Sequence, residues 1–196
     1  MSLFYVALVM INYLSKKLLF VVGSLRKESF NRQLANKVKE ILGDKAKVSF
    51  LEYSDVPFFN QDIEYPAPSS VSRIRDEIKA ADGIWFFTPE YNGSYSSVLK
   101  NIIDWASRSL DQTNPAGASA IGDKNVAVSG IGGSGYVQGV LEKTKELLKF
   151  IRTDVLDNSV GLAANPEAWA TNVITFSDDQ IKQLDKQVED FLAFLV

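Results

Sequence analysis

The chain of 196 residues contains no cysteine and no histidine. Their absence excludes catalytic triads that need histidine, thiol chemistry, disulfide bonds within the chain, and zinc or iron–sulfur sites with Cys or His ligands. An excess of one charge is missing as well, because 21 basic and 24 acidic residues leave a net charge of −3. Without a basic excess we expect no nucleic-acid partner. Any chemistry must come from carboxylates, hydroxyls, Lys, Arg, backbone amides or a bound cofactor.

Long hydrophobic runs are also missing. Residues 3–11 form an apolar run, whereas a membrane span needs about 20 apolar residues. A secretory signal has basic residues before its apolar run, but here Lys16 and Lys17 follow it. We therefore expect no membrane span, a cytoplasmic location, an N-terminal extension or arm over residues 1–16, and a single domain over residues 17–196.

The remaining chain alternates between two patterns. Continuous apolar runs at Leu18–Val22, Val48–Leu51, Ile84–Thr88 and Val126–Ser129 predict strands that are covered on both faces, and a fifth strand is expected within Asp154–Leu162. Apolar residues at helical spacing predict helices that start near Phe30, Val71, Val98, Val137 and Ile181. This alternation predicts a three-layer α/β/α domain with a five-stranded parallel sheet, and the strand order 2-1-3-4-5 fits that number of strands.

In that order the loops that leave strands 1, 3 and 4 share one edge of the sheet, where ligands bind in such folds. The first loop, Gly23–Arg32, leads into a helix N-terminus, which suits a phosphate group. Neutral donors there are Ser24, Ser29 and Asn31, and Arg26 adds a forked cation. A simpler interpretation of the same residues is a helix capped by Ser29 with its arginines in solvent.

The second loop begins with Pro89, Glu90, Tyr91 and Asn92. Its backbone amides can bond a planar heterocycle, and Tyr91 can pack near such a ring. The alternative is an ordinary turn, because Asn92-Gly93 is a strong turn-forming pair.

The third loop, Ser129–Gly135, matches the dinucleotide fingerprint GxGxxG through Gly130, Gly132 and Gly135. The motif follows the fourth strand, whereas the fingerprint belongs to the first strand–helix–strand unit. We therefore favour a flat backbone platform, including Gly133, against the ring of a ligand. A flexible glycine loop is the simpler alternative.

Two of these stretches resemble the NADPH-dependent FMN reductase family, which includes quinone, azo and chromate reductases. The stretches are GSLRKESFNR at 23–32 and PEYNGSYSSVLKNIIDWASR at 89–108, and the resemblance extends from residue 17 to about residue 150. Three features depart from the family pattern: Ser96-Ser97 occupies a stretch where many members have a proline, an arginine common near the end of the glycine loop is missing, and the N-terminal extension is unusual.

The resemblance implies a flavodoxin-like fold and noncovalently bound FMN. By resemblance, the phosphate would be held by Ser24, Arg26, Ser29 and Asn31. The edge of the isoalloxazine ring would be lined by Pro89, Glu90, Tyr91 and Asn92, and its other side would be closed by Ser129, Gly130, Gly132 and Gly133.

The function implied by the resemblance is a flavin-dependent NAD(P)H oxidoreductase. It would pass hydride from NADPH or NADH to FMN, and then to a quinone, azo, nitroaromatic, metal-oxyanion or flavin acceptor by a ping-pong mechanism. No side chain need act as a catalytic group, and the resemblance implies a homodimer or homotetramer. Three alternatives stay open: an electron carrier like flavodoxin, a dinucleotide-binding dehydrogenase that uses Gly130, Gly132 and Gly135, and an interaction module without a cofactor.

Overall fold

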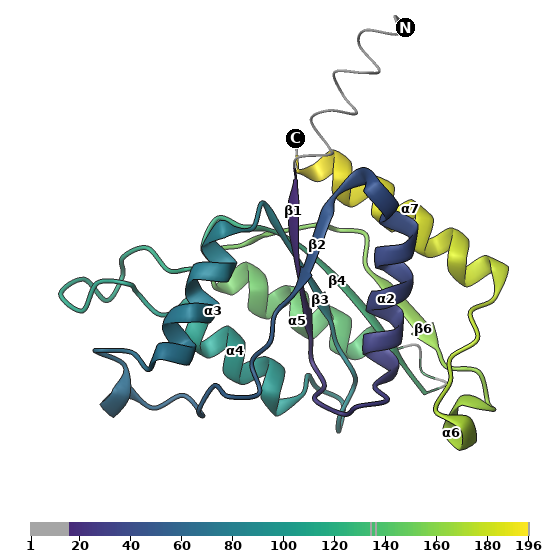
Figure 1. Ribbon diagram of the computed structural model, residues 1–196, viewed down its shortest axis with the longest axis horizontal. Helices are drawn as coiled ribbons and strands as arrows, with labels where there is room; N and C mark the ends of the chain where they lie inside the picture. Colours follow the sequence, from purple (N-terminus) through teal and green to yellow (C-terminus); the bar gives the residue numbers. More distant parts are fainter. Residues whose placement is uncertain (1–15, 134, 136, 196) are drawn as a thin grey trace, which may run out of the picture.

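A computed structural model describes residues 16–133, 135 and 137–195. Its strands are β1 (Lys17–Val22), β2 (Lys47–Phe50), β3 (Gly83–Phe87), β4 (Asn125–Gly132), β5 (Asp154–Val155) and β6 (Val160–Ala163). Its helices are α2 (Phe30–Leu42), α3 (Ser69–Ala80), α4 (Ser97–Ser107), α5 (Gln138–Phe150), α6 (Ala168–Thr171) and α7 (Asp178–Phe194), with short 3-10 turns at Gly43–Lys45 and Gln61–Ile63 (Figure 1). The expected N-terminal extension lies outside the described residues except for Lys16.

The strands form a parallel sheet of order β2-β1-β3-β4-β5, which confirms the expected order. The central ladders are continuous: β1 pairs with β3 from Leu18↔Gly83 to Val22↔Phe87, and β3 pairs with β4 from Gly83↔Asn125 onwards. Because the strands are parallel, the loops after β1, β3 and β4 leave at the same edge. This is the edge where the sequence placed the candidate site.

The fifth strand differs from the expectation. The stretch expected as one strand forms two short ones, and both pair with β4: β5 at its start and β6 at its end. Between them, the Nε2 of Gln187 donates to the backbone oxygens of Val128 (3.0 Å) and Asn158 (2.9 Å). A side chain from α7 therefore satisfies carbonyls that a continuous ladder would have paired, and the strand is interrupted there.

Helices cover both faces of the sheet, as continuous apolar strands require. On one face, α2 and α7 pack over residues such as Phe20 and Trp85, and on the other α3, α4 and α5 pack over residues such as Val21 and Phe86. In Figure 1, α3 and α4 lie at the left of the ribbon, and α2 and α7 lie on its right-hand side together with β6. The three-layer α/β/α fold is thus confirmed.

Helix starts follow the capping signals in the sequence. Ser29, Ser96 and Ser177 are the N-caps of α2, α4 and α7, and Ser177 forms a reciprocal capping box with Gln180. Among the described residues, no helix is both long and apolar enough to cross a bilayer. The helix α6 had no counterpart among the expected helices.

Candidate functional site

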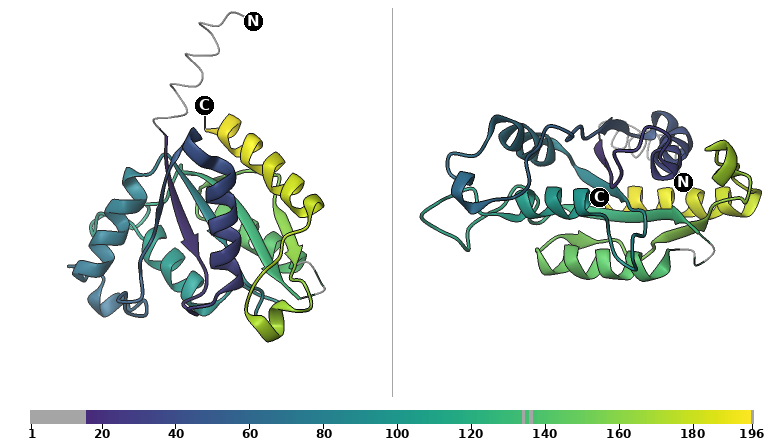
Figure 2. Two further views of the ribbon diagram at one scale, coloured as in Figure 1. Left: turned by 45° about the vertical axis from the view of Figure 1, so that its right-hand side comes forward. Right: turned by 90° about the horizontal axis from the view of Figure 1, so that it is seen from below.

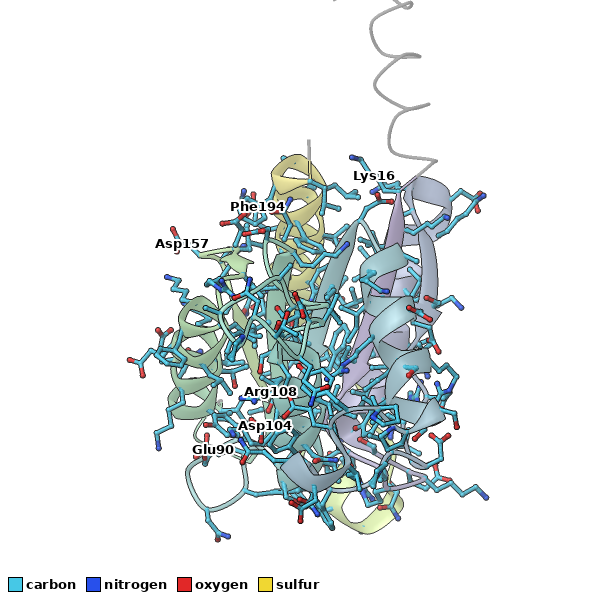
Figure 3. The ribbon with its side chains drawn as sticks, turned by 90° about the vertical axis from the view of Figure 1, so that its left-hand side faces the viewer. Lys16, Glu90, Asp104, Arg108, Asp157 and Phe194 are labelled. Atoms are coloured by element: carbon cyan, nitrogen blue, oxygen red, sulfur yellow. The ribbon has the colours of Figure 1, made fainter. Side chains whose placement is uncertain are left out.

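The loops at the carboxyl edge of the sheet enclose a cleft of about 310 Å³. Figure 3 shows Glu90 at this end of the molecule, opposite the end that carries Lys16 and Phe194. Most of the predicted site residues line the cleft: Ser24, Arg26, Ser29, Asn31, Pro89, Glu90, Tyr91, Gly132 and Gly133. The structure therefore brings together parts of all three loops that the sequence singled out.

The first loop ends in a helix start with free backbone donors. The hydroxyl of Ser29 accepts from the amide of Arg32 (3.3 Å), and the carbonyl of Ser29 accepts from Gln33 (3.1 Å). Within the part of the chain that the structure describes, the amides of Phe30 and Asn31 have no acceptor. Two backbone donors at the positive end of the helix dipole thus remain for an anion. Ser29 is confirmed as the N-cap of α2, and a contact between its hydroxyl and a phosphate stays a prediction.

The side chain of Arg26 lies beside this helix start. Its guanidinium carbon is 4.7 Å from the centre of the Phe30 ring, and its Nη1 donates to the Oδ1 of Asn172 at 2.8 Å. No carboxylate of the described residues is paired with it. Its positive charge is therefore not neutralised by an ion pair within that part of the protein.

The start of the first loop is held against α4. The amide of Gly23 donates to the carbonyl of Phe87 (2.7 Å), and the hydroxyl of Ser96 donates to the carbonyl of Gly23 (2.6 Å). A Cβ at position 23 would lie 3.2 Å from atoms of Pro89 and Leu99, so the close approach favours glycine. Ser96, which ends the second loop, thus links the first two loops.

A buried tyrosine is bonded to the same end of β1. The Tyr53 hydroxyl donates to the carbonyl of Val22, the last residue of β1. Burial raises the pKa of Tyr53 further above neutral pH, where the phenol is already a protonated donor.

The second loop contains a tight turn. The amide of Tyr91 donates to the carbonyl of Ser94 (2.9 Å) and the amide of Ser94 donates back (3.0 Å). Asn92 and Gly93, between them, have φ angles of 52° and 71°. Two central residues with positive φ define a type I′ turn, for which Asn-Gly is the preferred pair. Asn92 therefore forms the turn, as the alternative interpretation predicted, and lines an adjoining hollow that shares Glu90 and Gly133 with the main cleft.

Asn31 braces the third loop from the first. Its Nδ2 donates to the carbonyl of Ile131 (3.0 Å), and its Oδ1 accepts from the amide of Ile131 (3.1 Å). The side chain is only 3% exposed. It holds β4 against the start of α2. Because the side chain is engaged in these two bonds, Asn31 can offer its backbone amide to a ligand without breaking them.

Two predicted residues lie below the cleft instead of lining it. Ser129 is fully buried, where its hydroxyl accepts from Trp85 Nε1 (2.9 Å) and donates to Gln187 Oε1 (2.7 Å). Gly130 lies inside β4, and a Cβ there would stand 2.6 Å from the carbonyl oxygen of Thr88. Both residues serve packing beneath the glycine loop, whereas Gly132 and Gly133 reach the cleft.

Four further residues line the cleft, although none of them was expected there from the sequence: Phe30, Ile131, Trp169 and Asn172. Phe30 was expected only as the start of a helix. Trp169 and Asn172 come from the segment around α6, which Figure 2 (left) shows beside the start of α2. The sequence did contain a signal for Trp169 at the cleft, because it is a lone aromatic residue in a polar, turn-rich segment that follows a strand at this same edge.

The arrangement has the chemistry of an anion site joined to a flat backbone surface. One end offers two amides and a guanidinium, which suit a phosphate. The other end offers Pro89 and the backbone of Gly132 and Gly133, and a Cβ at position 133 would meet no atom within 4 Å. Among the described residues no group of acidic side chains could hold a metal ion. The cleft therefore suits a planar organic group that carries a phosphate.

Comparison with known proteins agrees with this chemistry. The model of the family described as NADPH-dependent FMN reductase matches residues 16–167. A quinone reductase of Pseudomonas putida is 36% identical over 181 residues, which cover 89% of this chain and 88% of the relative. A 2-hydroxy-1,4-benzoquinone reductase of a Burkholderia species is 39% identical over 114 residues, covering 58% of this chain and 59% of the relative.

Solved structures give the same result. FerB of Paracoccus denitrificans, described as a flavoenzyme NAD(P)H:(acceptor) oxidoreductase, superposes with a TM-score of 0.80 at 30% identity, covering 92% of this chain and 97% of its own. A flavodoxin from the domain Archaea superposes with a TM-score of 0.55 at 12% identity, covering 91% of this chain and 98% of its own, and so shares the fold alone.

Proposed function

This chain belongs to the NADPH-dependent FMN reductase family, with FMN as its cofactor and NAD(P)H as its donor, and we propose that the cleft at the carboxyl edge of the sheet holds the FMN. The observation that carries the proposal is the convergence of an unpaired guanidinium and two free amides at one end of the cleft. Arg26 supplies the first, and Phe30 and Asn31 supply the second. Ser24 and Ser29 add hydroxyls along the same wall.

The residues at the other end fit the ring of the cofactor. Pro89 stiffens the exit from β3, and the type I′ turn keeps Glu90 and Tyr91 at the cleft wall. Gly132 and Gly133 present backbone without side chains, which lets a flat ring approach closely. We infer that the amides of Glu90 and Asn92 lie at the edge of the ring, where they can donate to its heteroatoms, whereas the amide of Tyr91 is bonded to Ser94 within the turn.

When bound, FMN supplies the chemistry of accepting hydride from NAD(P)H and delivering it to an acceptor, in a ping-pong sequence. The chain binds and orients the cofactor, and no described side chain at the cleft is required as a nucleophile. Tyr91 lines the cleft and is 53% exposed, and we infer that a flat second substrate approaches the cofactor beside it. We propose quinones as acceptors, because two relatives are named for quinone reduction; azo, nitroaromatic, metal-oxyanion and flavin acceptors are further candidates.

The first experiment is an absorption spectrum of the purified protein after FMN addition and desalting, and again after anaerobic NADPH. We expect flavin bands that survive desalting and bleach with NADPH. Loss of the flavin on desalting would contradict the proposed site, and a retained flavin that does not bleach would favour an electron carrier with another donor.

The phosphate end of the site is tested with Arg26→Ala. We expect FMN affinity to fall by roughly tenfold or more, since a hydrogen bond to a charged partner is lost. The matched control is Lys27→Ala, which removes the same charge from an exposed neighbour in the same loop. Equal losses in both variants would mean that only the overall charge matters, and unchanged affinity in a folded Arg26→Ala protein would remove Arg26 from the site.

We also propose that the protein is a homodimer or homotetramer, an expectation that rests on the family. Light scattering coupled to size-exclusion chromatography measures this directly. A monomer at micromolar concentration would contradict it.

A further inference from the structure

The guanidinium of Arg26 sits at the end of an exposed, flexible side chain. Such a side chain loses conformational freedom when it must hold one geometry, so a site that needs it gains from contacts that orient it beforehand. Two contacts do so here: the Phe30 ring lies 4.7 Å from the guanidinium carbon, and Asn172 Oδ1 accepts from Nη1 at 2.8 Å. The second partner comes from a residue 146 positions away in the chain.

Asn172 is itself held firmly against α2. Gln33, on the first turns of α2, donates through Nε2 to the carbonyl of Asn172 (2.8 Å) and accepts through Oε1 from the amide of Ile174 (2.9 Å). These two bonds clamp the backbone on both sides of Val173. The segment around Asn172 is therefore fixed to the same helix whose N-terminus forms the phosphate end of the cleft.

Two more features hold this segment in place. Asn172 ends α6 with a φ of 60°, and its amide donates to the carbonyl of Ala168 (2.8 Å). Asparagine is one of the few residues other than glycine that adopt this left-handed conformation readily. Trp169, one turn earlier, packs edge-to-face on Phe30 with ring centres 5.2 Å apart. Arg26, Phe30 and Trp169 thus form a continuous row of contacts along the cleft wall.

The chemistry of the Asn172 side chain suits a partner that must stay charged. An amide oxygen accepts one N–H of the guanidinium without neutralising it, whereas a carboxylate in the same place would cancel the charge. Arginine has five N–H donors in a rigid fork, so a bond from Nη1 to Asn172 leaves others free for phosphate oxygens.

We propose that Asn172 is a positioning residue for the cofactor phosphate: it orients Arg26 toward the cleft and leaves its charge unpaired. The proposal rests on the proposed location of FMN, with its phosphate at the start of α2. It adds to the site a residue from the connection between β6 and α7, which neither of the two sequence motifs contains.

The test compares FMN with riboflavin, which has the same ring and lacks the phosphate. The full-length protein is stripped of flavin and titrated with each compound, with flavin fluorescence as the readout. Two variants are used. Asn172→Gly keeps the left-handed backbone and removes the amide, and Asn172→Asp keeps the size of the side chain and places a carboxylate beside Arg26.

We expect the dissociation constant of FMN to rise about threefold or more in Asn172→Gly and about tenfold or more in Asn172→Asp, while that of riboflavin changes by less than about twofold. A residue with a merely structural role would change both ligands alike, so the ratio of the two constants is the decisive quantity. In an Arg26→Ala background, Asn172→Asp should lower FMN affinity much less than in the wild-type protein, because the guanidinium through which residue 172 acts has been removed.

The matched control is Asn165→Ala. Asn165 lies in the same connection, where its side chain bonds Glu167 (3.1 Å) and the amide of Thr175 (2.9 Å) and makes no bond to Arg26. We expect its ratio of FMN to riboflavin affinity to stay at the wild-type value. A ratio that shifts equally in Asn165→Ala and Asn172→Gly would overturn the proposal in favour of general packing of the segment.

The two levels of inference fail in different ways. If Arg26→Ala selectively weakens FMN and both Asn172 variants leave the ratio unchanged, the role of Asn172 is wrong and the location of the phosphate stands. If Arg26→Ala itself leaves the ratio unchanged, the location of the phosphate is wrong, and the role of Asn172 falls with it.

Discussion

The two sides of β4 are held by different means. Toward β3, the ladder runs without a break from Gly83↔Asn125 to Phe87↔Ser129. Toward the other side, β5 and β6 pair with the two ends of β4 and leave its middle unpaired by any strand. The first side depends on backbone bonds between apolar strands, and the second depends on polar side chains that enter the sheet.

The side chains on the second side form a chain of hydrogen bonds. Trp85 donates to Ser129, Ser129 donates to Gln187, and Gln187 donates to the carbonyls of Val128 and Asn158. Ser129 and Gln187 are fully buried, where an unsatisfied polar group is costly. The comparison teaches that a continuous strand can be predicted from a local apolar run, whereas an interrupted one depends on a partner far away in the sequence.

The largest effect is expected from Gln187→Leu, which keeps the side-chain volume and removes its polar atoms. It leaves the carbonyls of Val128 and Asn158 without their donor, so we expect unfolding free energy to fall by about 3 kcal/mol. Urea denaturation measures this. Gln183→Leu, on the exposed side of the same helix, should change stability by less than about 0.5 kcal/mol. Equal effects of the two substitutions would show that the middle of β4 does not depend on Gln187.

An intermediate effect is expected from Asn31→Ala, which breaks the link between α2 and the end of β4. Both backbone groups of Ile131 lose their side-chain partner, and we expect stability to fall by about 2 kcal/mol and FMN affinity to fall with it. Denaturation and flavin titration measure the two effects. Asn36→Ala, on the exposed face of the same helix, is the control. Wild-type FMN affinity in a folded Asn31→Ala protein would mean that FMN binding does not depend on the bonds between Asn31 and Ile131.

The smallest effect is expected from Gly93→Ala in the turn of the second loop. The residue has a φ of 71° and a new Cβ would meet only Lys143 Nζ, at 4.0 Å, so the cost is confined to the backbone. We expect a loss of about 1 kcal/mol, because alanine disfavours this conformation. Gly139→Ala is the control with the opposite sign: it lies in α5 with nothing within 4 Å of its Cβ, and alanine there should stabilise by about 0.5 kcal/mol. A stabilised Gly93→Ala protein would contradict the type I′ turn.

Much of the site was predictable because its signals are local. Ser29 and Ser96 cap helices within three residues of their own positions, and Asn92-Gly93 forms its turn with its immediate neighbours. The apolar runs identified the four principal strands, and the sheet order then placed their loops at one edge. Features of this kind can be predicted because they depend on residues close together in the sequence.

The remaining parts of the site depend on contacts across the chain. Asn31 was expected as a donor to a ligand, and the structure shows its side chain bonded to Ile131, 100 positions away. Ser129 was expected at the ring, and its hydroxyl is bonded instead to the buried side chains of Trp85 and Gln187. Asn172 and Trp169 reach the cleft through contacts with α2 that are distant in sequence, such as the bond from Gln33 to the carbonyl of Asn172 and the packing of Trp169 on Phe30.

By itself, the sequence determined the alternation of strands and helices, the caps, the turn in the second loop and the family, because each depends on periodicity or on neighbouring residues. Only the tertiary structure decided which polar side chains face the cleft and which hold the sheet together. The physical reason is that a buried hydroxyl or amide must find a partner, and that partner lies wherever the fold brings the chain together.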